Sequence, residues 1–237
     1  RQVPNVASTW EAREVFKMLV ENPRERGAIA QRAWRRVAQA HTMQDRMVEI
    51  REMLGVSQAR RPVDVELHVE AAQVTEELLD DLNSQTLLGQ ENASIWLTLH
   101  GSDIPLDGQA GKIRLVSAGS PSIPSPDYVG HVSGSQRYGR FYLEDLILNL
   151  EKFLPEPIVT KSRWADMLAM PEDDEQSTDT VRHGAWLARK NAPGLLALVQ
   201  RCVEDSADVA LEDASAYAAD PFNVITRERA HLSGWEA

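Results

Sequence analysis

The clearest pattern in the chain is the run Val63-Asp64-Val65-Glu66-Leu67-His68-Val69. Apolar and polar residues alternate through all seven positions, which is the two-residue period of a half-buried β-strand. Residues 71–83 then carry valine and leucine at helical spacing, and residues 95–100 form a second strand-like apolar run. This change of period predicts a strand–helix–strand unit, the repeating element of α/β proteins.

The same kind of pattern continues to the end of the chain. Further strands are expected over 113–116, 128–132, 158–160, 185–188 and 222–225, and helices over 141–153, after Pro193 and from near Asp205. Strands that alternate with helices predict a mainly parallel sheet flanked by helices on both faces. In such sheets ligands collect at the carboxyl ends of the strands, so the strand-to-loop junctions are where chemistry is expected.

Residues 1–55 have a different character and are expected to form three short helices. Ser8 with Glu11, Asn22 before a proline, and Thr42 are the capping residues that begin such helices, and Gly55 ends the last one. Three short amphipathic helices bury little by themselves, so they are expected to lean on a neighbour. The predicted organisation is a helical segment over 1–55, a polar linker over 56–62 and an α/β domain over 63–237.

Composition and charge exclude several classes of function. The chain has 36 acidic and 25 basic side chains and a formal charge of −11, so phosphate backbones and anionic lipids are repelled. No apolar run is long enough to span a bilayer. Cys202 is the single cysteine, which excludes an internal disulfide and favours a reducing, cytoplasmic location. The chain opens at Arg1 and not at Met, which leaves open a further domain before it.

The first junction with possible chemistry is Leu99-His100-Gly101, at the end of the second predicted strand. His100 can hydrogen-bond a ligand, and Gly101 allows a ligand to approach the backbone closely. The alternative is a turn that ends the strand, with a histidine satisfied inside the protein.

The second junction is the polar loop Ser133-Gly134-Ser135-Gln136, followed by Tyr138-Gly139. Mg²⁺ and Mn²⁺ require anionic oxygen ligands, and this loop offers hydroxyls and an amide but no carboxylate. Its backbone N–H groups could receive a phosphate. The alternative is a plain turn.

The third candidate is the pair Glu204 and Asp205, expected at a helix start. One carboxylate of such a pair can act as a general base on a hydroxyl, whereas the alternative is helix capping. The acidic run 172–175 could gather a cation, but such runs are usually solvated. The sequence contains no phosphate-binding P-loop, dinucleotide fingerprint, nucleophile elbow or zinc-ligand spacing.

In order along the chain, these junctions resemble those of the family 2 glycosyltransferases, which have the GT-A fold. The matching segments are Leu99-His100-Gly101, Asp127-Tyr128-Val129, Tyr138-Gly139, Tyr142-Leu143-Glu144-Asp145-Leu146 and Ala219-Asp220-Pro221-Phe222-Asn223-Val224. The resemblance implies donor-binding roles for His100, Gly101, Ser133, Ser135 and Tyr138. It also places Glu204 and Asp205 at the family's general-base motif.

Residues 9–54 resemble something else, the C-terminal helices of spore-maturation-type glycosyltransferases of GT-B fold. The matching part runs from Glu25-Arg26-Gly27 to Ala40-His41-Thr42. The two kinds of module occur in tandem, so this resemblance implies a glycosyltransferase context for the whole chain.

The chain departs from the family at the places that matter for catalysis. The aspartates of the family are replaced by residues 133–136, the Asn-Arg type nucleotide loop is absent after Val69, and the helix before the fourth strand is missing. We therefore expect a degenerate GT-A-like domain without metal site or cofactor, acting as a scaffold or interaction module of a glycosyltransferase. The alternatives are an active metal-independent glycosyltransferase, with a nucleotide sugar as donor and a hydroxyl as acceptor, and catalysis by a protein partner or a missing N-terminal domain.

Overall fold

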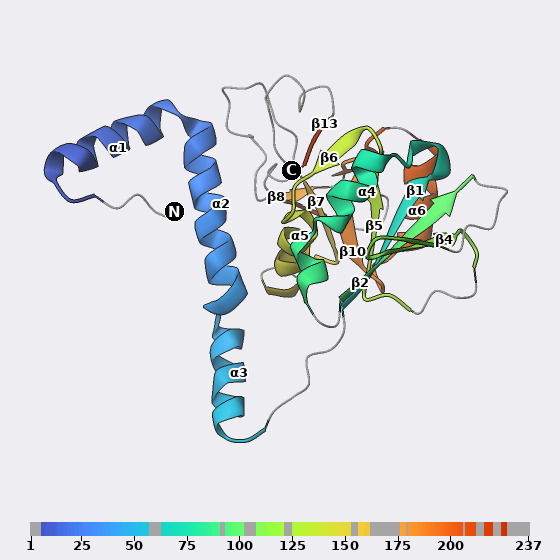
Figure 1. Cartoon of the computed structure of the whole chain (residues 1–237), viewed down its shortest axis with the longest axis horizontal. Coiled ribbons are helices and arrows are strands. Elements are labelled where there is room, and N and C mark those ends of the chain that lie inside the picture. Colours follow the sequence, from blue (N-terminus) through green and yellow to red (C-terminus); the bar gives the residue numbers. More distant parts are fainter. Residues whose placement is uncertain are drawn as a thin grey trace.

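A computed structural model describes residues 6–56, 63–90, 93–101, 108–120, 125–152, 156–161, 176–178, 180–205, 207–211, 216–219 and 224–226. Three helices form an arm that stands beside an α/β body (Figure 1). The helices of the arm are α1 (Thr9–Glu21), α2 (Pro23–Ala40) and α3 (Met43–Met53). The three predicted helices are confirmed, and no helix among the described residues is long and apolar enough to cross a membrane.

The predicted caps of the arm are present. The Ser8 hydroxyl accepts from the Glu11 N–H, and the Asn22 side chain accepts from the Glu25 N–H. Thr42 and Asp45 form a reciprocal capping box at the start of α3. The Glu11 carboxylate accepts from Ala7 N–H, one residue before the position that a complete capping box would use.

The body contains the following elements: β1 (Val63–Glu70), η1 (Ala71–Gln73), α4 (Glu76–Asn83), η2 (Thr86–Gly89), β2 (Ala93–His100), β3 (Gly108–Ala110), β4 (Ile113–Ser117), β5 (Tyr128–Val132), β6 (Gln136–Tyr138), α5 (Tyr142–Lys152), β7 (Ile158–Lys161), β8 (Gln176–Thr178), β9 (Thr180–Val181), β10 (Ala185–Arg189), α6 (Leu195–Glu204), β11 (Val209–Ala210), β12 (Ala216–Ala219) and β13 (Val224–Thr226). Within the described residues, the central sheet has nine strands in the order β3-β4-β2-β1-β5-β10-β7-β12-β8. Strands β4, β2, β1, β5, β7 and β12 run in one direction, and β3, β10 and β8 oppose them. The predicted α/β class, with a mostly parallel sheet flanked by helices, is confirmed.

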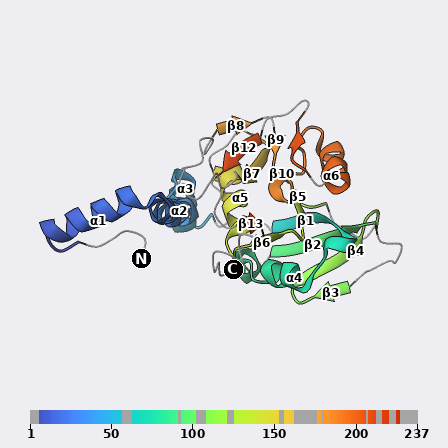
Figure 2. The ribbon, with the colours of Figure 1, turned by 90° about the horizontal axis from the view of Figure 1, so that it is seen from above.

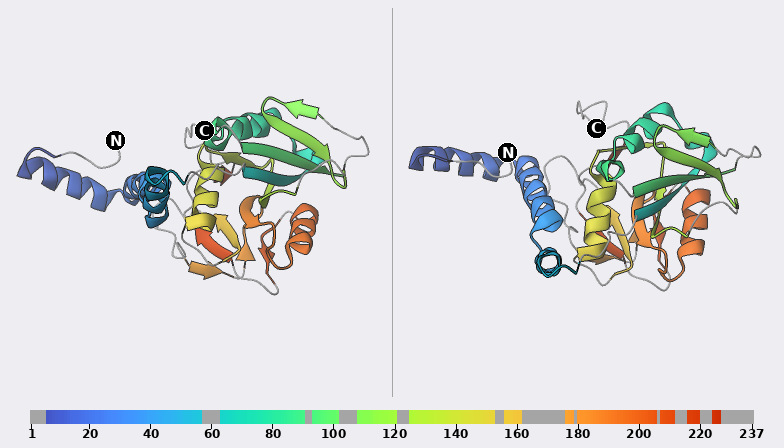
Figure 3. Two further views of the ribbon diagram at one scale, coloured as in Figure 1. Left: turned by 90° about the horizontal axis from the view of Figure 1, so that it is seen from below. Right: turned by 60° about the horizontal axis from the view of Figure 1, so that its bottom comes forward.

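The sheet is covered on both faces, as Figures 2 and 3 show, with α4 and α5 on one side and α6 on the other. The alternation of β1 explains the first layer: Val65, Leu67 and Val69 are buried in a core with the leucines of α4 and α5. On the opposite face, Trp186 of β10 and Cys202 of α6 belong to a second buried cluster. The side chains that alternate with the first core, Glu66 and His68 among them, therefore face the α6 side of the sheet.

Several boundaries differ from the sequence prediction. The helix expected over 71–83 is divided into η1 and α4, because Thr75 accepts from the N–H of Leu78 and starts α4 there. The helix expected from near Asp205 is wrong, since Asp205 is the C-cap of α6 and the chain is extended at that residue. The last strand is β13, and residues 220–223 of the expected segment lie outside the described residues.

Strand β6 was missed and closes the loop after β5. It pairs with β13 and is tied to α4, where Arg137 donates to both carboxylate oxygens of Asp81 at 2.8 Å. The buried Asp81 also accepts from the N–H of Tyr138. The segment that reads as a polar loop is thus a tight turn between two strands.

Candidate functional site

The carboxyl ends of β1, β2 and β5 meet at one edge of the sheet and bring three histidines together. Glu70 of β1 is in register with His100 of β2, and His68 of β1 is in register with His131 of β5. A fourth histidine, His183, precedes the oppositely directed β10, so it reaches the same edge. Its ring lies 4.7 Å from that of His131, centroid to centroid.

Two of these histidines form a polar chain with Glu66 across β1 and β2. His68 Nδ1 lies 2.8 Å from His100 Nε2, and His68 Nε2 lies 3.4 Å from Glu66 Oε1. The Thr98 hydroxyl donates to the same carboxylate oxygen at 2.7 Å. The alternation of β1 and β2 places all four side chains on one face, and the parallel register places them side by side.

The histidine cluster is uncharged at neutral pH. Burial lowers the pKa of His68 to about 3, helped by the nearby His100. Burial also lowers the pKa of His131 to about 3, with His183, His68 and His100 adding to the effect, and it lowers the pKa values of His100 and His183. An imidazole that stays neutral can accept as well as donate a hydrogen bond, which an imidazolium cannot.

His131 has a fixed internal role. It is buried, and its Nδ1 accepts from the N–H of Gly184 at 3.1 Å. His183 is held by its own N–H, which donates to Asp208 Oδ1, and by a hydrogen bond to the backbone of Cys202 in α6. These two histidines fasten β10 and α6 to the edge of β5.

The predicted donor-binding serines lie in the turn between β5 and β6, where Ser133 contacts η1 and the exposed Ser135 contacts Ser133. Ser133 is buried, and its hydroxyl donates to Gln73 Oε1 at 2.8 Å. The N–H of Gly134 donates to the same oxygen at 3.2 Å, and the hydroxyls of Ser133 and Ser135 lie 2.8 Å apart. A Cβ at position 134 would collide with the carbonyl oxygen of Gln73. The turn and η1 therefore fit closely against each other.

The other predicted site residues fall in three different settings. Tyr138 is buried, accepts from the N–H of Ser133 and donates to the carbonyl oxygen of Gly184 at 2.6 Å. Gly101 is exposed and has a φ of +75°, and a Cβ at this position would meet no atom within 4 Å among the described residues. His100 is half-buried beside it.

Glu204 and Asp205 lie at the end of α6, and both are exposed. The Glu204 carboxylate accepts from Gln200 Nε2 at 2.9 Å. Since Cys202 contacts His183, this end of α6 lies near the histidine cluster. Residues 172–175 lie outside the described residues. Within the described ranges, no group of three or more His, Cys, Asp or Glu side chains is placed to hold a metal ion.

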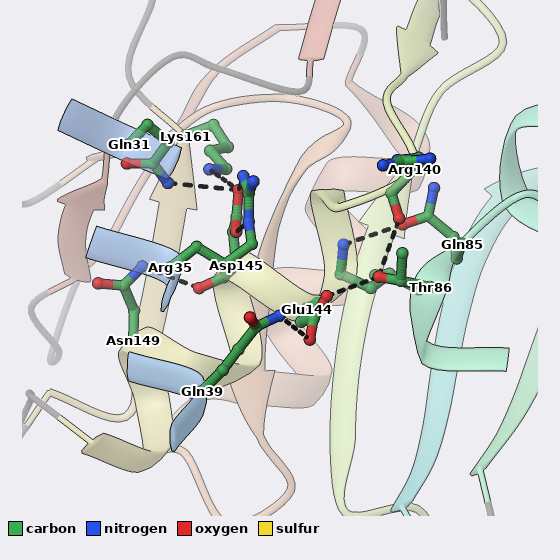
Figure 4. A network of polar contacts seen from close by, with 11 residues as sticks. Gln31, Arg35, Gln39, Gln85, Thr86, Arg140, Glu144, Asp145, Asn149 and Lys161 are labelled. Carbon is green, nitrogen blue, oxygen red and sulfur yellow. Dashed lines mark hydrogen bonds and ion pairs between the residues drawn. The ribbon is translucent and has the colours of Figure 1, made fainter. Parts of the chain in front are cut away.

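A second polar network, which no pattern in the sequence predicts, joins the arm to the body (Figure 4). Arg35 of α2 donates to both oxygens of the fully buried Asp145 of α5, at 2.6 and 2.8 Å. Gln31 also donates to Asp145, and Lys161 Nζ lies 3.9 Å from it. Asp145 belongs to the Tyr-Leu-Glu-Asp-Leu motif, so in this chain the motif's acid holds α2 in place.

A similar contact lies one residue away. Gln39 of α2 and Thr86 of η2 both donate to the Glu144 carboxylate, at 2.8 and 2.7 Å. Arg35 also stacks on the ring of Phe141, 4.0 Å from its centroid. Helix α2 is thus attached to one face of α5 through charged and polar groups, and its Ala38 is fully buried as well.

Comparison with known proteins gives a partial picture. No protein-family model matches the chain, and no curated protein matches it. Among solved structures, it is similar to Staphylococcus aureus TarS 1–349, at 10% identity and a TM-score of 0.36 over 67% of this chain and 60% of that one. The complex of that protein with UDP-GlcNAc gives 11% identity and a TM-score of 0.37 over 74% and 62%. The glycosyltransferase GlyE of Streptococcus pneumoniae TIGR4 gives 14% identity and a TM-score of 0.35 over 60% and 38%. The chain therefore spans about three fifths of the length of the TarS structures that it matches.

Proposed function

We propose that this chain is a degenerate GT-A-like glycosyltransferase domain that does not transfer sugar by itself and acts as a scaffold or interaction module of a glycosyltransferase. The observation that carries the proposal is the direct contact between η1 and the turn at residues 133–135. In the family that the sequence resembles, the segment after the first strand and the segment after the fourth are the two that receive the donor. Here η1, the segment after β1, packs directly against the turn that follows β5, at residues 133–135.

The contact leaves little for a donor to bind. The side-chain oxygen of Gln73 accepts from both Ser133 and Gly134, and the turn brings no carboxylate. Buried hydroxyl and N–H groups that already have partners contribute little to a ligand, because each new hydrogen bond would first require breaking an old one. Opening the turn would also separate two backbones that only a glycine allows to approach.

The charge distribution supports the same proposal. Residues 1–62 contain 12 basic and 7 acidic side chains, whereas residues 63–237 contain 13 basic and 29 acidic ones. The body therefore carries a formal charge of −16. A nucleotide diphosphate would enter this negative field without a cluster of carboxylates in the turn to hold a compensating cation.

The role as an interaction module is supported by the arm. Of the fourteen large apolar side chains exposed among the described residues, thirteen lie in the arm or directly beside its helices: Val6, Trp10, Phe16, Met18, Val20, Val37, Met43, Met47, Val48, Ile50, Met53, Leu54 and Val56. The body contributes one, Leu196. Concentrated exposed apolar surface marks an interaction site more often than isolated apolar residues do.

Calorimetric titration of the full chain with UDP- and GDP-sugars, with and without Mn²⁺, tests the catalytic half of the proposal. UDP-GlcNAc, the ligand in one of the similar structures, is titrated first. We expect no heat of binding from a sample whose circular dichroism shows a folded α/β protein. Binding that requires Mn²⁺ would contradict the proposal, since it would mean that carboxylates elsewhere form a metal site.

The alternative is an active, metal-independent transferase, and the half-buried His100 is the observation that favours it. Its uncharged imidazole could accept a proton from an acceptor hydroxyl, as could Asp205 at the end of α6. Turnover of a UDP-sugar without metal, lost in Asp205→Ala or His100→Ala while donor affinity is kept, would establish this alternative.

A further inference from the structure

Donor and acceptor rules, applied to the 3.4 Å contact between Glu66 Oε1 and His68 Nε2, give the series Glu66, His68 and His100 a direction. An ionised carboxylate only accepts hydrogen bonds, so the ring nitrogen that faces Glu66, His68 Nε2, interacts favourably when it carries the proton. A neutral imidazole has one N–H, and His68 Nδ1 must then be the acceptor. The hydrogen bond of 2.8 Å between the two rings is therefore donated by His100 Nε2.

The last atom of the chain is His100 Nδ1. With its single proton on Nε2, this nitrogen presents a lone pair, and it has no hydrogen-bond partner among the described residues. If His68 carried its proton on Nδ1 instead, two acceptors would face each other, the Glu66 carboxylate and His68 Nε2, 3.4 Å apart. Thr98 supports the inferred direction because its hydroxyl donates to the carboxylate and helps to hold the acid in place.

The exposure of the three side chains also differs, and a binding site requires that the residue that contacts the ligand be the accessible one. Glu66 and His68 are mostly buried, with 12% of each side chain exposed, whereas His100 is less buried than His68 and adjoins the exposed Gly101. None of the described residues, its two chain neighbours left aside, lies within 4 Å of a Cβ at Gly101. The inner residues are thus held in position and the outer one is accessible.

We propose that Glu66 and His68 are positioning residues that keep His100 in its Nε2–H tautomer, so that His100 Nδ1 serves as an uncharged hydrogen-bond acceptor for a hydroxyl of a neutral carbohydrate at the carboxyl end of β2. A neutral acceptor suits a hydroxyl donor and gives no charge attraction to a phosphate. The negative body discourages anions in addition. This site lies on β1 and β2, and it does not depend on whether the turn at residues 133–135 binds a nucleotide.

The experiment is ¹⁵N-detected histidine NMR of the full chain at neutral pH, which distinguishes protonated from unprotonated ring nitrogens. We expect His100 in the wild-type chain to be protonated at Nε2 and unprotonated at Nδ1. In Glu66→Gln the amide can donate as well as accept, so the tautomer of His68 is no longer imposed. The hydrogen bond between His68 and His100 can then run in either direction, and we expect a fraction of His100 to be protonated at Nδ1. Glu70→Gln is the matched control, since Glu70 lies on the same strand and face but bonds Gln73, and it should leave the tautomer unchanged.

The second arm of the experiment adds a probe. Methyl β-D-glucopyranoside should shift the Nδ1 resonance of His100 in the wild-type chain and in Glu70→Gln, and less in Glu66→Gln. A wild-type His100 that is protonated at Nδ1, or a tautomer that Glu66→Gln leaves unchanged, would overturn the positioning roles. A response to inorganic phosphate and not to the glucoside, or to neither, would overturn the assignment of a neutral carbohydrate. These NMR outcomes can be interpreted even if calorimetric titration shows no binding of nucleotide sugars, because the two experiments test different sites.

Discussion

The arm and the body of this molecule differ in how much of their apolar surface they bury. The body encloses its apolar residues in two layers around a sheet, and one large apolar side chain, Leu196, stays exposed among its described residues. In the arm, α1 has no buried residue, and Phe16 and Met53 are 70% and 85% exposed. Helix α2 attaches the arm to the body, and the buried ion pair of Arg35 with Asp145 is part of that attachment. The contrast indicates that the body already buries its apolar surface, whereas the arm still has surface to bury.

Among single substitutions at neutral pH, breaking the attachment between the two regions should have the largest effect on stability. Replacing Asp145 with alanine leaves Arg35 and Lys161 buried without their acid, so we expect a loss of about 3–5 kcal/mol in the free energy of unfolding. Urea unfolding measures it. The matched control is Glu25→Ala, which removes the exposed ion pair with Arg32 and should cost less than about 1 kcal/mol. Equal losses in the two variants would show that the buried network does not hold α2.

The histidine cluster should make the body, and not the arm, sensitive to acid. Because burial holds the pKa values of His68 and His131 near 3, the unfolded chain takes up protons below pH 6.5 and the folded chain does not. Stability should be unaffected above that pH and should fall between about pH 6.5 and 3, by about 1.4 kcal/mol per pH unit for each histidine. Urea midpoints at several pH values measure this, and His131→Gln should reduce the slope. A flat profile would mean that both histidines are protonated in the folded state.

The closed turn offers a smaller test inside the body. A methyl group at position 134 has no space against Gln73, so Gly134→Ala should destabilise the chain by about 1–3 kcal/mol and loosen η1. Hydrogen exchange of the amides at residues 71–75 would report the loosening. Gly89→Ala is the control, because none of the described residues lies within 4 Å of a side chain at that position. Normal protection in Gly134→Ala would contradict the close fit.

The smallest effect on stability, but the most direct view of the arm, should come from its apolar surface. We expect the arms of two copies to bury α1 and α3 against each other, which makes the chain self-associate. Phe16→Asp with Ile50→Asp should weaken this association, as measured by sedimentation equilibrium, while the unfolding midpoint stays nearly constant. Leu196→Asp, a change at an exposed apolar residue of the body, should leave association unchanged. A monomer at all concentrations would leave the arm's surface for a different protein.

The class of the fold could be predicted because burial on each side of a strand leaves a period in the sequence. The alternation around Leu67 and the helical spacing around Leu146 both correspond to the core that is observed. The end of α6 could not be predicted, since Glu204 and Asp205 suit a helix start by charge, and only the turn of the chain at residue 205 shows that they follow the helix. Short strands such as β6 carry too few residues to show a period, and their pairing is set by distant partners.

The candidate site was predictable in part for a similar reason. His100 and Gly101 could be named because they end a strand, and the structure places them at the carboxyl edge of the sheet. Glu66 and His68 were missed because their alternation with the core marks them as the outer side of the strand. That side of the strand is buried only because α6 packs against it, and no local sequence pattern around Glu66 and His68 predicts this packing. Ser133 follows β5 and lies close to this edge, but the Gln73 that its hydroxyl contacts is sixty residues away.

The pairing of Arg35 with Asp145 also has a consequence for the order in which the molecule is made. The two residues are separated by 110 positions, so α2 leaves the ribosome long before the helix that holds it exists. During that interval its arginine has no acid to meet, and the apolar residues of the neighbouring α1 and α3 are in water. The arm is thus synthesised before the helix that holds it and reaches its final position only after that helix has formed, and this is the period when a chaperone or a second nascent chain would find it most accessible.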